Sequence, residues 1–309
     1  MKDFWQITDE NDENTRLDNY LSDLFENFSR SYLQKLIKDG KVLINGEIKK
    51  TSYKVRLGDK VAIEAAEEKE IIIHPQNIPL EIVFEDDNMA VVNKPSGMLT
   101  HPTSLETENT LVNALLYKYD ENLSDINGHF RRGILHRLDR NTSGLLMIAK
   151  NNQTHEFLAE QIKERAIIKK YLAIVKGVVK QDSGVINLPI GRNPKHPEKM
   201  AVVEDGKPSI TEFKVIKRFK DATFLELDLK TGRTHQIRVH LNHLHHPIVN
   251  DSLYGGSGFK VKTQEQVLQS YKLSFTKPLT NDIIELEIEP DEKIKKVLTY
   301  LENLQGDRT

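Results

Sequence analysis

The chain has 309 residues, of which 38% are hydrophobic and 29% charged, and its formal net charge is −2. That length accommodates one large and one small domain, and the near-neutral charge means that an RNA partner would have to be held by local basic patches. Cysteine is absent, which excludes disulfides, thiolate zinc sites, iron–sulfur clusters and a cysteine nucleophile.

Residues 1–14 are acidic and lack the basic-then-apolar order of a secretion signal, so we expect a short acidic tail. No apolar run in the chain approaches the ~20 residues that are needed to cross a bilayer. Together with the absence of cysteine, these features predict a cytoplasmic protein.

Residues 15–65 are expected to form a small domain of two helices and a hairpin. Apolar residues recur at helical spacing in two stretches, and Ser29 or Ser31 is suited to the N-cap of the second helix. Residues 41–50, KVLINGEIKK, predict two strands joined by an Asn-Gly turn.

Positive charge is concentrated in this small domain. Residues 30–60 contain nine basic and three acidic side chains, and contact with RNA phosphates explains this asymmetry better than a solvated lysine-rich surface. The motifs RLDNYL, SRSYLQKLIKDGKVLINGE and GDKV resemble the alpha-L RNA-binding domain first described in a small-subunit ribosomal protein. The residues predicted to bind RNA are Arg30, Lys35, Lys38, Lys41, Lys49 and Lys50.

Residues 66–79 contain a glutamate cluster and two prolines and are expected to be a linker, so that residues 80–309 form the larger domain. Within it we expect a hairpin around residues 86–88 and further strands that alternate with helices. The expected helices lie at residues 110–117, 153–164, 235–244 and 291–304. Residues 189–208 are expected to form a long loop without a strand, whose basic side chains either reach phosphates or are ordinary surface.

Asp139 is the candidate with the clearest chemistry. It lies between Arg137 and Arg140, in a polar loop between two apolar runs, the second of which predicts a short buried strand. Cationic neighbours favour the charged form of a carboxylate, and an ionised carboxylate on a rigid loop can act as a nucleophile or a base. From composition alone, a solvated turn remains an equal alternative.

The sequence of this loop favours a catalytic carboxylate over a solvated turn. Residues 136–146, HRLDRNTSGLL, resemble the active-site motif of the RluA/RluD-type ribosomal large subunit pseudouridine synthases. The family's NKPxG…HP, KxYxA and GRxHQIRxH elements are matched near Lys94, Tyr171 and His235. Its GDxxYG turn is matched by NDSLYG, where Asn250 replaces the usual glycine and is tolerated because asparagine accepts left-handed backbone angles. The resemblance covers about residues 15–290.

The resemblance implies roles for individual residues. Asp139 would be catalytic, Tyr171 would lie against the target base, and Arg238 would pair with Asp139, with Arg233 as the second choice for that pairing. The residues expected to bind the substrate are His136, Arg137, Arg140, Arg233, Lys94 and His101.

The histidines in residues 235–246 also invite a metal-site interpretation. No carboxylate joins them at ligand spacing and the HExxH pattern is missing, so packing and polar contacts are the better prediction. We therefore expect no metal and no cofactor, because moving uracil on its ribose needs neither.

The predicted fold is α+β: a small N-terminal α/β RNA-binding domain, then a pseudouridine synthase catalytic domain with a mixed, largely antiparallel central sheet flanked by helices. The resemblance implies that a monomeric enzyme isomerises specific uridines in structured RNA, with 23S ribosomal RNA preferred and transfer RNA as the alternative. Two other classes stay open. One is a non-catalytic ribosome-assembly factor that binds RNA, and the other is an RNA methyltransferase, which would need a glycine-rich cofactor loop after a strand.

Overall fold

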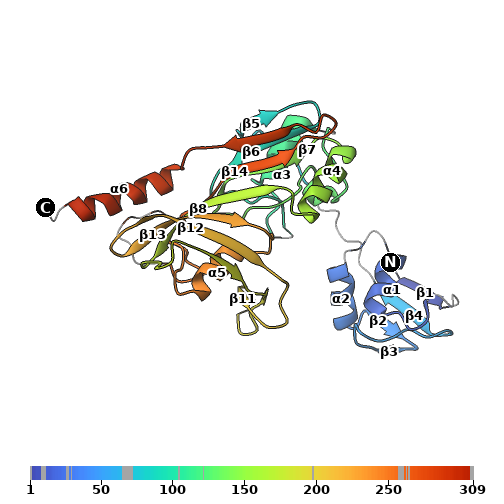
Figure 1. Ribbon diagram of the computed structural model, residues 1–309. Coiled ribbons are helices and arrows are strands. Elements are labelled where there is room, and N and C mark those ends of the chain that lie inside the picture. The colour runs from blue at the N-terminus through green and yellow to red at the C-terminus, as the bar shows by residue number, and fades with distance from the viewer. Residues whose placement is uncertain are drawn as a thin grey trace. The chain divides into compact units, whose positions relative to one another are not determined.

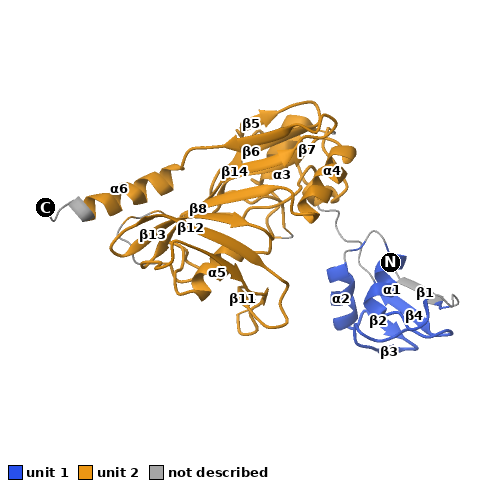
Figure 2. Cartoon of the chain, viewed as in Figure 1, with its two compact units in different colours: residues 1–72 blue, residues 73–309 orange. Residues whose placement is uncertain are grey.

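The computed structural model of the chain divides into two compact units, residues 1–72 and residues 73–309 (Figure 2). The residues that the structure describes are 2–7, 12–25, 28, 30–64, 72–103, 105–120, 122–196, 198–256, 261, 263 and 265–306. Ser29, one of the two expected N-cap residues, lies outside this set. Ser31 lies inside the second helix, so its expected place at the cap was wrong.

The first unit packs two helices against a four-stranded sheet (Figure 1). The helices are α1 (Leu17–Leu24) and α2 (Arg30–Lys38), and the strand order is β1 (Lys2–Gln6), β4 (Lys60–Glu64), β2 (Val42–Ile44) and β3 (Glu47–Ile48). The apolar helix residues form one core with the strands, as their helical spacing predicts. Asn45 and Gly46 both have positive φ, as the two-residue turn between β2 and β3 requires.

The segment at residues 2–7 differs from the expected acidic tail. Strand β1 pairs antiparallel with β4, and Ile7 is buried in the core of the unit. The acidity of the segment gives no information on strand pairing, and the exposed edge of β4 can pair with another strand.

Residues 73–79 of the expected linker belong to the second unit. Ile73 is buried in that unit's core. Asn113 Nδ2 donates a hydrogen bond to the carbonyl oxygen of His74 at 2.8 Å. The backbone carbonyl oxygen of Asn113 accepts one from Gln76 N at 2.9 Å. Residues 73–79 are therefore attached to the larger unit by specific hydrogen bonds.

The second unit is built on a nine-stranded sheet. Its strand order is β5 (Glu81–Glu85), β6 (Met89–Lys94), β7 (Ser143–Ala149), β14 (Leu268–Thr276), β8 (Ile168–Lys176), β13 (Ala222–Leu229), β12 (Ile210–Arg218) and β9 (Ser183–Asn187), with β15 (Ile283–Glu287) also paired to β14. Strands β7 and β14 run parallel and the other neighbours run antiparallel. The predicted mixed, largely antiparallel sheet is thus confirmed.

The parallel contact between β7 and β14 depends on one glycine. Gly144 has φ +114°, and a Cβ atom added to it would lie 2.0 Å from the carbonyl oxygen of Ser270. Only glycine allows two backbones to approach this closely. This contact fixes the strand that directly follows the loop of Asp139.

Helices cover both faces of the sheet. On one face, α3 (Leu111–Tyr119) and α5 (Gln236–His243) share a core with Tyr171, Ala173 and Val175 of β8. On the other face, α4 (Asn152–Lys163) packs on β7, and α6 (Glu292–Gly306) packs near the alternate β8 residues. Because side chains alternate along a strand, Tyr171 faces the side that carries α5.

The expected strandless loop at residues 189–208 contains a small hairpin. Strand β10 (Ile190–Arg192) pairs antiparallel with β11 (Met200–Val202). Ile190 is buried against Val239 and Tyr254. Strands of three residues are too short to show a clear alternation in the sequence, which is why the pattern missed them.

Candidate active site

Asp139 lies in the loop that leads into β7. The turn after it is closed by a hydrogen bond from Thr142 N to the carbonyl oxygen of Asp139 at 3.0 Å. The side chain of Asp139 is 17% exposed, so the carboxylate is accessible but largely enclosed.

Residues 93–102, the NKPSG…HP segment, hold this loop in place by hydrogen bonds and thus act as a brace. Thr100 Oγ1 donates to the carbonyl oxygen of Leu138 at 2.8 Å and accepts from Leu138 N at 3.3 Å. Ser96 Oγ donates to the carbonyl oxygen of Asn141 at 2.8 Å. These bonds hold the backbone on both sides of Asp139.

Lys94 belongs to the same brace and does not line the pocket, contrary to its expected role in substrate binding. Its side chain is fully buried. Its Nζ atom donates to the carbonyl oxygens of Pro95 and Met98, both at 2.8 Å, and of Arg140 at 3.1 Å. Burial lowers the pKa of Lys94 to about 7, and the three carbonyl acceptors offset that cost because they satisfy every N–H of the ammonium.

Arg238 of α5 joins Asp139 to a second carboxylate. Its Nη1 atom donates to Asp139 Oδ2 at 2.8 Å, while Nε and Nη2 donate to the two oxygens of Asp251 at 2.8 and 3.0 Å. Asp251 is buried, and its Oδ1 atom also accepts from the backbone N–H groups of Leu253 and Tyr254, both at 3.1 Å. Burial by itself would lower the pKa of Arg238, but the two carboxylates outweigh it and hold that pKa above its usual value.

The first turn of α5 is fixed by a buried glutamine. Gln236 Nε2 donates to Thr211 Oγ1 at 2.9 Å and to the carbonyl oxygen of Ile210 at 3.0 Å. Its Oε1 atom accepts from Thr231 Oγ1 at 2.7 Å and from Arg233 N at 3.0 Å. Gln236, the glutamine of the HQIR motif, thus fixes the position of the helical turn from which Arg238 extends.

His235 approaches Asp139 from the N-cap of α5. Its Nδ1 atom lies 2.9 Å from Tyr254 Oη, which also accepts from Met200 N at 2.9 Å, and its Nε2 atom lies 3.9 Å from Asp139 Oδ2. Met200 N donates to the hydroxyl oxygen, so the Tyr254 proton is available to Nδ1; the tautomer that accepts it carries the histidine proton on Nε2, which faces Asp139. Burial lowers the pKa of His235, so the ring is neutral at pH 7.

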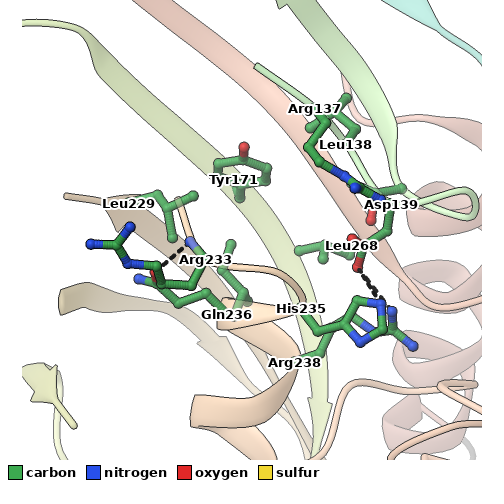
Figure 3. A pocket seen from close by; sticks show the side chains of 12 residues that line it. Arg137, Leu138, Asp139, Tyr171, Leu229, Arg233, His235, Gln236, Arg238 and Leu268 are labelled. Carbon is green, nitrogen blue, oxygen red and sulfur yellow. Dashed lines mark hydrogen bonds and ion pairs between the residues drawn. The ribbon is translucent and has the colours of Figure 1, made fainter. Parts of the chain in front are cut away.

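One pocket is lined by Asp139, Tyr171, Arg233, His235 and Arg238 (Figure 3). Tyr171 is only 5% exposed. Burial, together with the charge of Asp139, raises the pKa of the Tyr171 hydroxyl, which therefore stays protonated. The structure thus brings all three residues expected to be catalytic to a single site.

Among the residues expected to bind substrate, Arg137 and Arg233 also line the pocket, and both are exposed. Arg140 instead points to Glu106, with which it forms two hydrogen bonds, the longer of them 2.9 Å. It therefore cannot serve as the cationic partner of Asp139 that the linear sequence suggested, and Arg238 takes that place.

The two histidines expected to bind substrate are held away from the pocket. His136 Nε2 accepts from Met147 N at 3.1 Å, and burial of the ring lowers the pKa of His136 to about 3, so the ring is neutral. His101 is not among the residues that line the pocket around Asp139, and burial lowers its pKa to about 4. Neither residue lines this pocket, whereas His136 lines the depression beside it, so their contact with substrate stays a prediction.

In the first unit, Lys35, Lys38, Lys41 and Lys50 are exposed, as a phosphate-binding surface requires. Arg30 instead donates to the buried carboxylate of Asp18 at 3.1 Å, with Arg16 and Gln34 as the other donors. Burial raises the pKa of Asp18, but these bonds outweigh it and hold that pKa far below its usual value. Lys49 pairs with Glu47 at 2.5 Å.

Arg30 and Lys49 therefore hold fewer free donors for RNA than the other four residues predicted to bind it.

Within the described part of the chain, no three His, Cys, Asp or Glu side chains gather where a metal ion could be held. None of the helices in the described ranges has the length and apolarity to cross a membrane.

A basic two-helix unit joined to a sheet that holds an ion-paired carboxylate in a pocket fits an RNA-modifying enzyme. Family comparison gives RNA pseudouridylate synthase over residues 88–243 and the S4 domain over residues 15–61. An uncharacterized RNA pseudouridine synthase of Aquifex aeolicus is 42% identical over 300 residues, which are 94% of this chain and 95% of the relative. Ribosomal large subunit pseudouridine synthase D of Escherichia coli O6:H1 is 41% identical over 248 residues, 80% of this chain and 74% of the relative.

A solved structure agrees with these sequence matches. Human RNA pseudouridylate synthase domain containing 1 superposes with a TM-score of 0.56 at 26% identity, over 72% of this chain and 95% of the human one. The chain therefore belongs to the RNA pseudouridylate synthase family: it is an RNA pseudouridine synthase, an isomerase, with an S4 RNA-binding domain before the catalytic one.

The sequence predicted no role at the site for three residues that the structure places there. Asp251 belongs to the NDSLYG turn, and nothing in that motif indicates that its carboxylate pairs with Arg238. Thr100 had no signal beyond its place beside the HP dipeptide. His235 has φ +56°, a left-handed angle that is uncommon for histidine and that orients its ring toward Asp139.

Proposed function

We propose that this enzyme converts specific uridines of large-subunit ribosomal RNA to pseudouridine, with Asp139 as the essential residue acting on a nucleotide flipped out of its stack. The observation that carries this proposal is the ion pair of Asp139 with Arg238, 2.8 Å long, in a pocket that Tyr171 also lines. A base inside a helix cannot reach an enclosed carboxylate, so the target must leave its stack at a cost of a few kcal/mol that RNA contacts offset.

The reaction is an isomerisation that balances without any co-reactant. The bond between N1 of uracil and C1′ of ribose breaks, the base turns, and a bond forms between C5 and C1′. The proton on C5 leaves, and N1 takes up a proton. Asp139 acts first, by attack on the sugar or the base or by removal of a ribose proton, and its guanidinium partner keeps the carboxylate oriented.

Tyr171 suits the role of a platform for the base. Its hydroxyl stays protonated and its ring is held by the strand, so it can stack on uracil without gaining a charge. His235 presents an N–H to the same space and is available for a hydrogen bond with the base or with Asp139.

Ribosomal RNA is the favoured substrate because several close relatives carry the name ribosomal large subunit pseudouridine synthase D. Transfer RNA is the alternative substrate. We also propose that the enzyme acts as a monomer in the cytoplasm, in keeping with a ribosomal RNA substrate.

The test is the substitution Asp139→Asn, assayed on large-subunit ribosomal RNA that carries tritium at C5 of uridine. Wild-type enzyme should release tritium to water, and Asp139→Asn should release none while binding the RNA nearly as tightly. Asp182→Asn, which changes an 89% exposed carboxylate that pairs with Arg218 outside the pocket, is the matched control and should retain full activity. A residual rate of a few per cent or more in Asp139→Asn contradicts the role of Asp139, and release from transfer RNA alone would change the substrate.

A further inference from the structure

A second depression adjoins the pocket of Asp139. Its volume is about 470 Å³, and it shares Arg137, Tyr171, Leu229 and Arg233 with that pocket. Its basic lining residues are Arg137, Lys163, Arg165, Lys169, Lys230 and Arg233, which we call the basic groove. No Asp or Glu is among the described residues that line it.

Lys169 is the unusual member of the basic groove. It lies two residues before Tyr171 on β8, so both side chains point to the same face of the sheet. The residue is only 7% exposed, yet its ammonium has no hydrogen bond or ion pair with any residue in the described ranges. Burial lowers its pKa, with Asp228 as the one carboxylate that acts against this effect. A largely buried ammonium that has no hydrogen-bonding partner in the described ranges destabilises a fold, and a negatively charged ligand in the groove that Lys169 lines would offset this cost.

Three of the other cations have free donors as well. Arg137 and Arg165 form no side-chain hydrogen bond or ion pair with the part of the chain that the structure describes, and Arg233 donates only to the carbonyl oxygen of Pro208, at 3.3 Å. Lys163 and Lys230 are already engaged by carboxylates at the rim. The free donors of the groove thus belong to Lys169 and three arginines, and two of those arginines, Arg137 and Arg233, also line the pocket.

We infer that the basic groove binds a phosphodiester of the RNA strand next to the target nucleotide, with Lys169 as its buried anchor. This inference rests on the proposed function, because that function puts a nucleotide in the adjoining pocket. A phosphate has the charge that Lys169 lacks and enough oxygens for Lys169 and an arginine fork at once. The flanking phosphate is covalently tied to the nucleotide in the pocket, so the shared wall of Arg137 and Arg233 puts it within reach of the groove.

A phosphate held there would also aid the reaction. Everting a nucleotide requires the backbone beside it to adopt a new path, and a contact made only on that path favours the flipped state. Lys169 therefore acts as a positioning residue, and it does not touch the reacting atoms.

The test compares Lys169→Met with Lys170→Met. Lys170 is the next residue of the same strand but faces the other way, where its Nζ atom donates to Glu226 at 2.9 Å. The probe is a transcript of bacterial large-subunit ribosomal RNA, and its equilibrium binding is measured at several salt concentrations. Lys169→Met should weaken binding about 5- to 20-fold at low salt and reduce the slope of log K against log salt by about one. Lys170→Met should leave that slope unchanged.

A stability measurement separates this role from a structural one. Methionine keeps the shape of Lys169 and removes an uncompensated charge, so the urea midpoint of Lys169→Met should equal or exceed that of wild type. A loss of stability together with a loss of binding would make Lys169 a structural residue and overturn the inference, as would an unchanged salt slope.

The outcome is also distinguishable from failure of the proposed function. If wild type forms pseudouridine but the two variants have the same salt slope, phosphate binding by Lys169 in the basic groove is refuted and the proposed function stands. If wild type forms none and the slopes still differ by about one, the function is refuted and the phosphate site stands.

Discussion

The substitution Asp251→Asn tests how the site holds its carboxylate. Asp251 is the second partner of Arg238, and asparagine has nearly the same shape without the charge. The amide oxygen can keep the bonds from Leu253 N and Tyr254 N, but the amide nitrogen then faces Arg238 Nε, so that a donor meets a donor.

The expected size of the effect follows from these contacts. Removal of one partner from a buried ion pair costs about 3–5 kcal/mol when the other charge is left alone. Here Arg238 retains Asp139, at 2.8 Å, and two backbone bonds survive. We therefore expect the free energy of unfolding to fall by about 2–4 kcal/mol. A guanidinium held at one end also orients Asp139 less well, which should lower kcat by about 10- to 100-fold with little change in KM.

The assay pairs urea unfolding with tritium release from ribosomal RNA. Asp182→Asn is the matched control, because Asp182 also pairs with an arginine, Arg218, at 2.7 Å, but its side chain is 89% exposed. That variant should lose less than about 1 kcal/mol and no activity. The reasoning is refuted if Asp251→Asn matches Asp182→Asn in both stability and kcat. A rise in KM at constant kcat would instead mean that Asp251 shapes the RNA-binding surface.

Three more outcomes follow from the site. Lys94→Met leaves three carbonyl oxygens without their donor and should lower the free energy of unfolding by about 2–4 kcal/mol; an unchanged urea midpoint would contradict the brace. Burial holds the pKa of His136 at about 3, against 6.5 when exposed. The unfolded chain therefore binds a proton that the native chain does not bind, and the free energy of unfolding decreases as the pH falls below about 6.5. His136→Gln keeps an acceptor for Met147 N and should flatten that loss in urea midpoints between pH 6 and 4, whereas parallel curves would exclude His136 as the cause. Tyr254→Phe removes the hydroxyl that fixes the proton of His235 and should lower kcat about 10-fold at constant KM; equal kcat values would show that this proton has no part in the rate.

The amino-acid sequence was sufficient for most of the longer elements, and the family resemblance of one motif pointed to Asp139. Helical spacing predicted α1, α2, α3 and α4, and the Asn-Gly pair marked the turn after β2, because these patterns depend on neighbours along the chain. The HRLD motif singled out Asp139 in the same way. Short strands with no long alternation, β1, β10 and β11, were missed.

The tertiary structure decided which charges meet. Arg140 is next to Asp139 in the chain but binds Glu106, while Arg238, 99 residues away, forms the ion pair. Lys94 has the residue type of a substrate ligand, yet burial makes it a brace. These outcomes depend on the parallel contact of β7 with β14 and on where α5 packs, and both are long-range arrangements that no local pattern encodes.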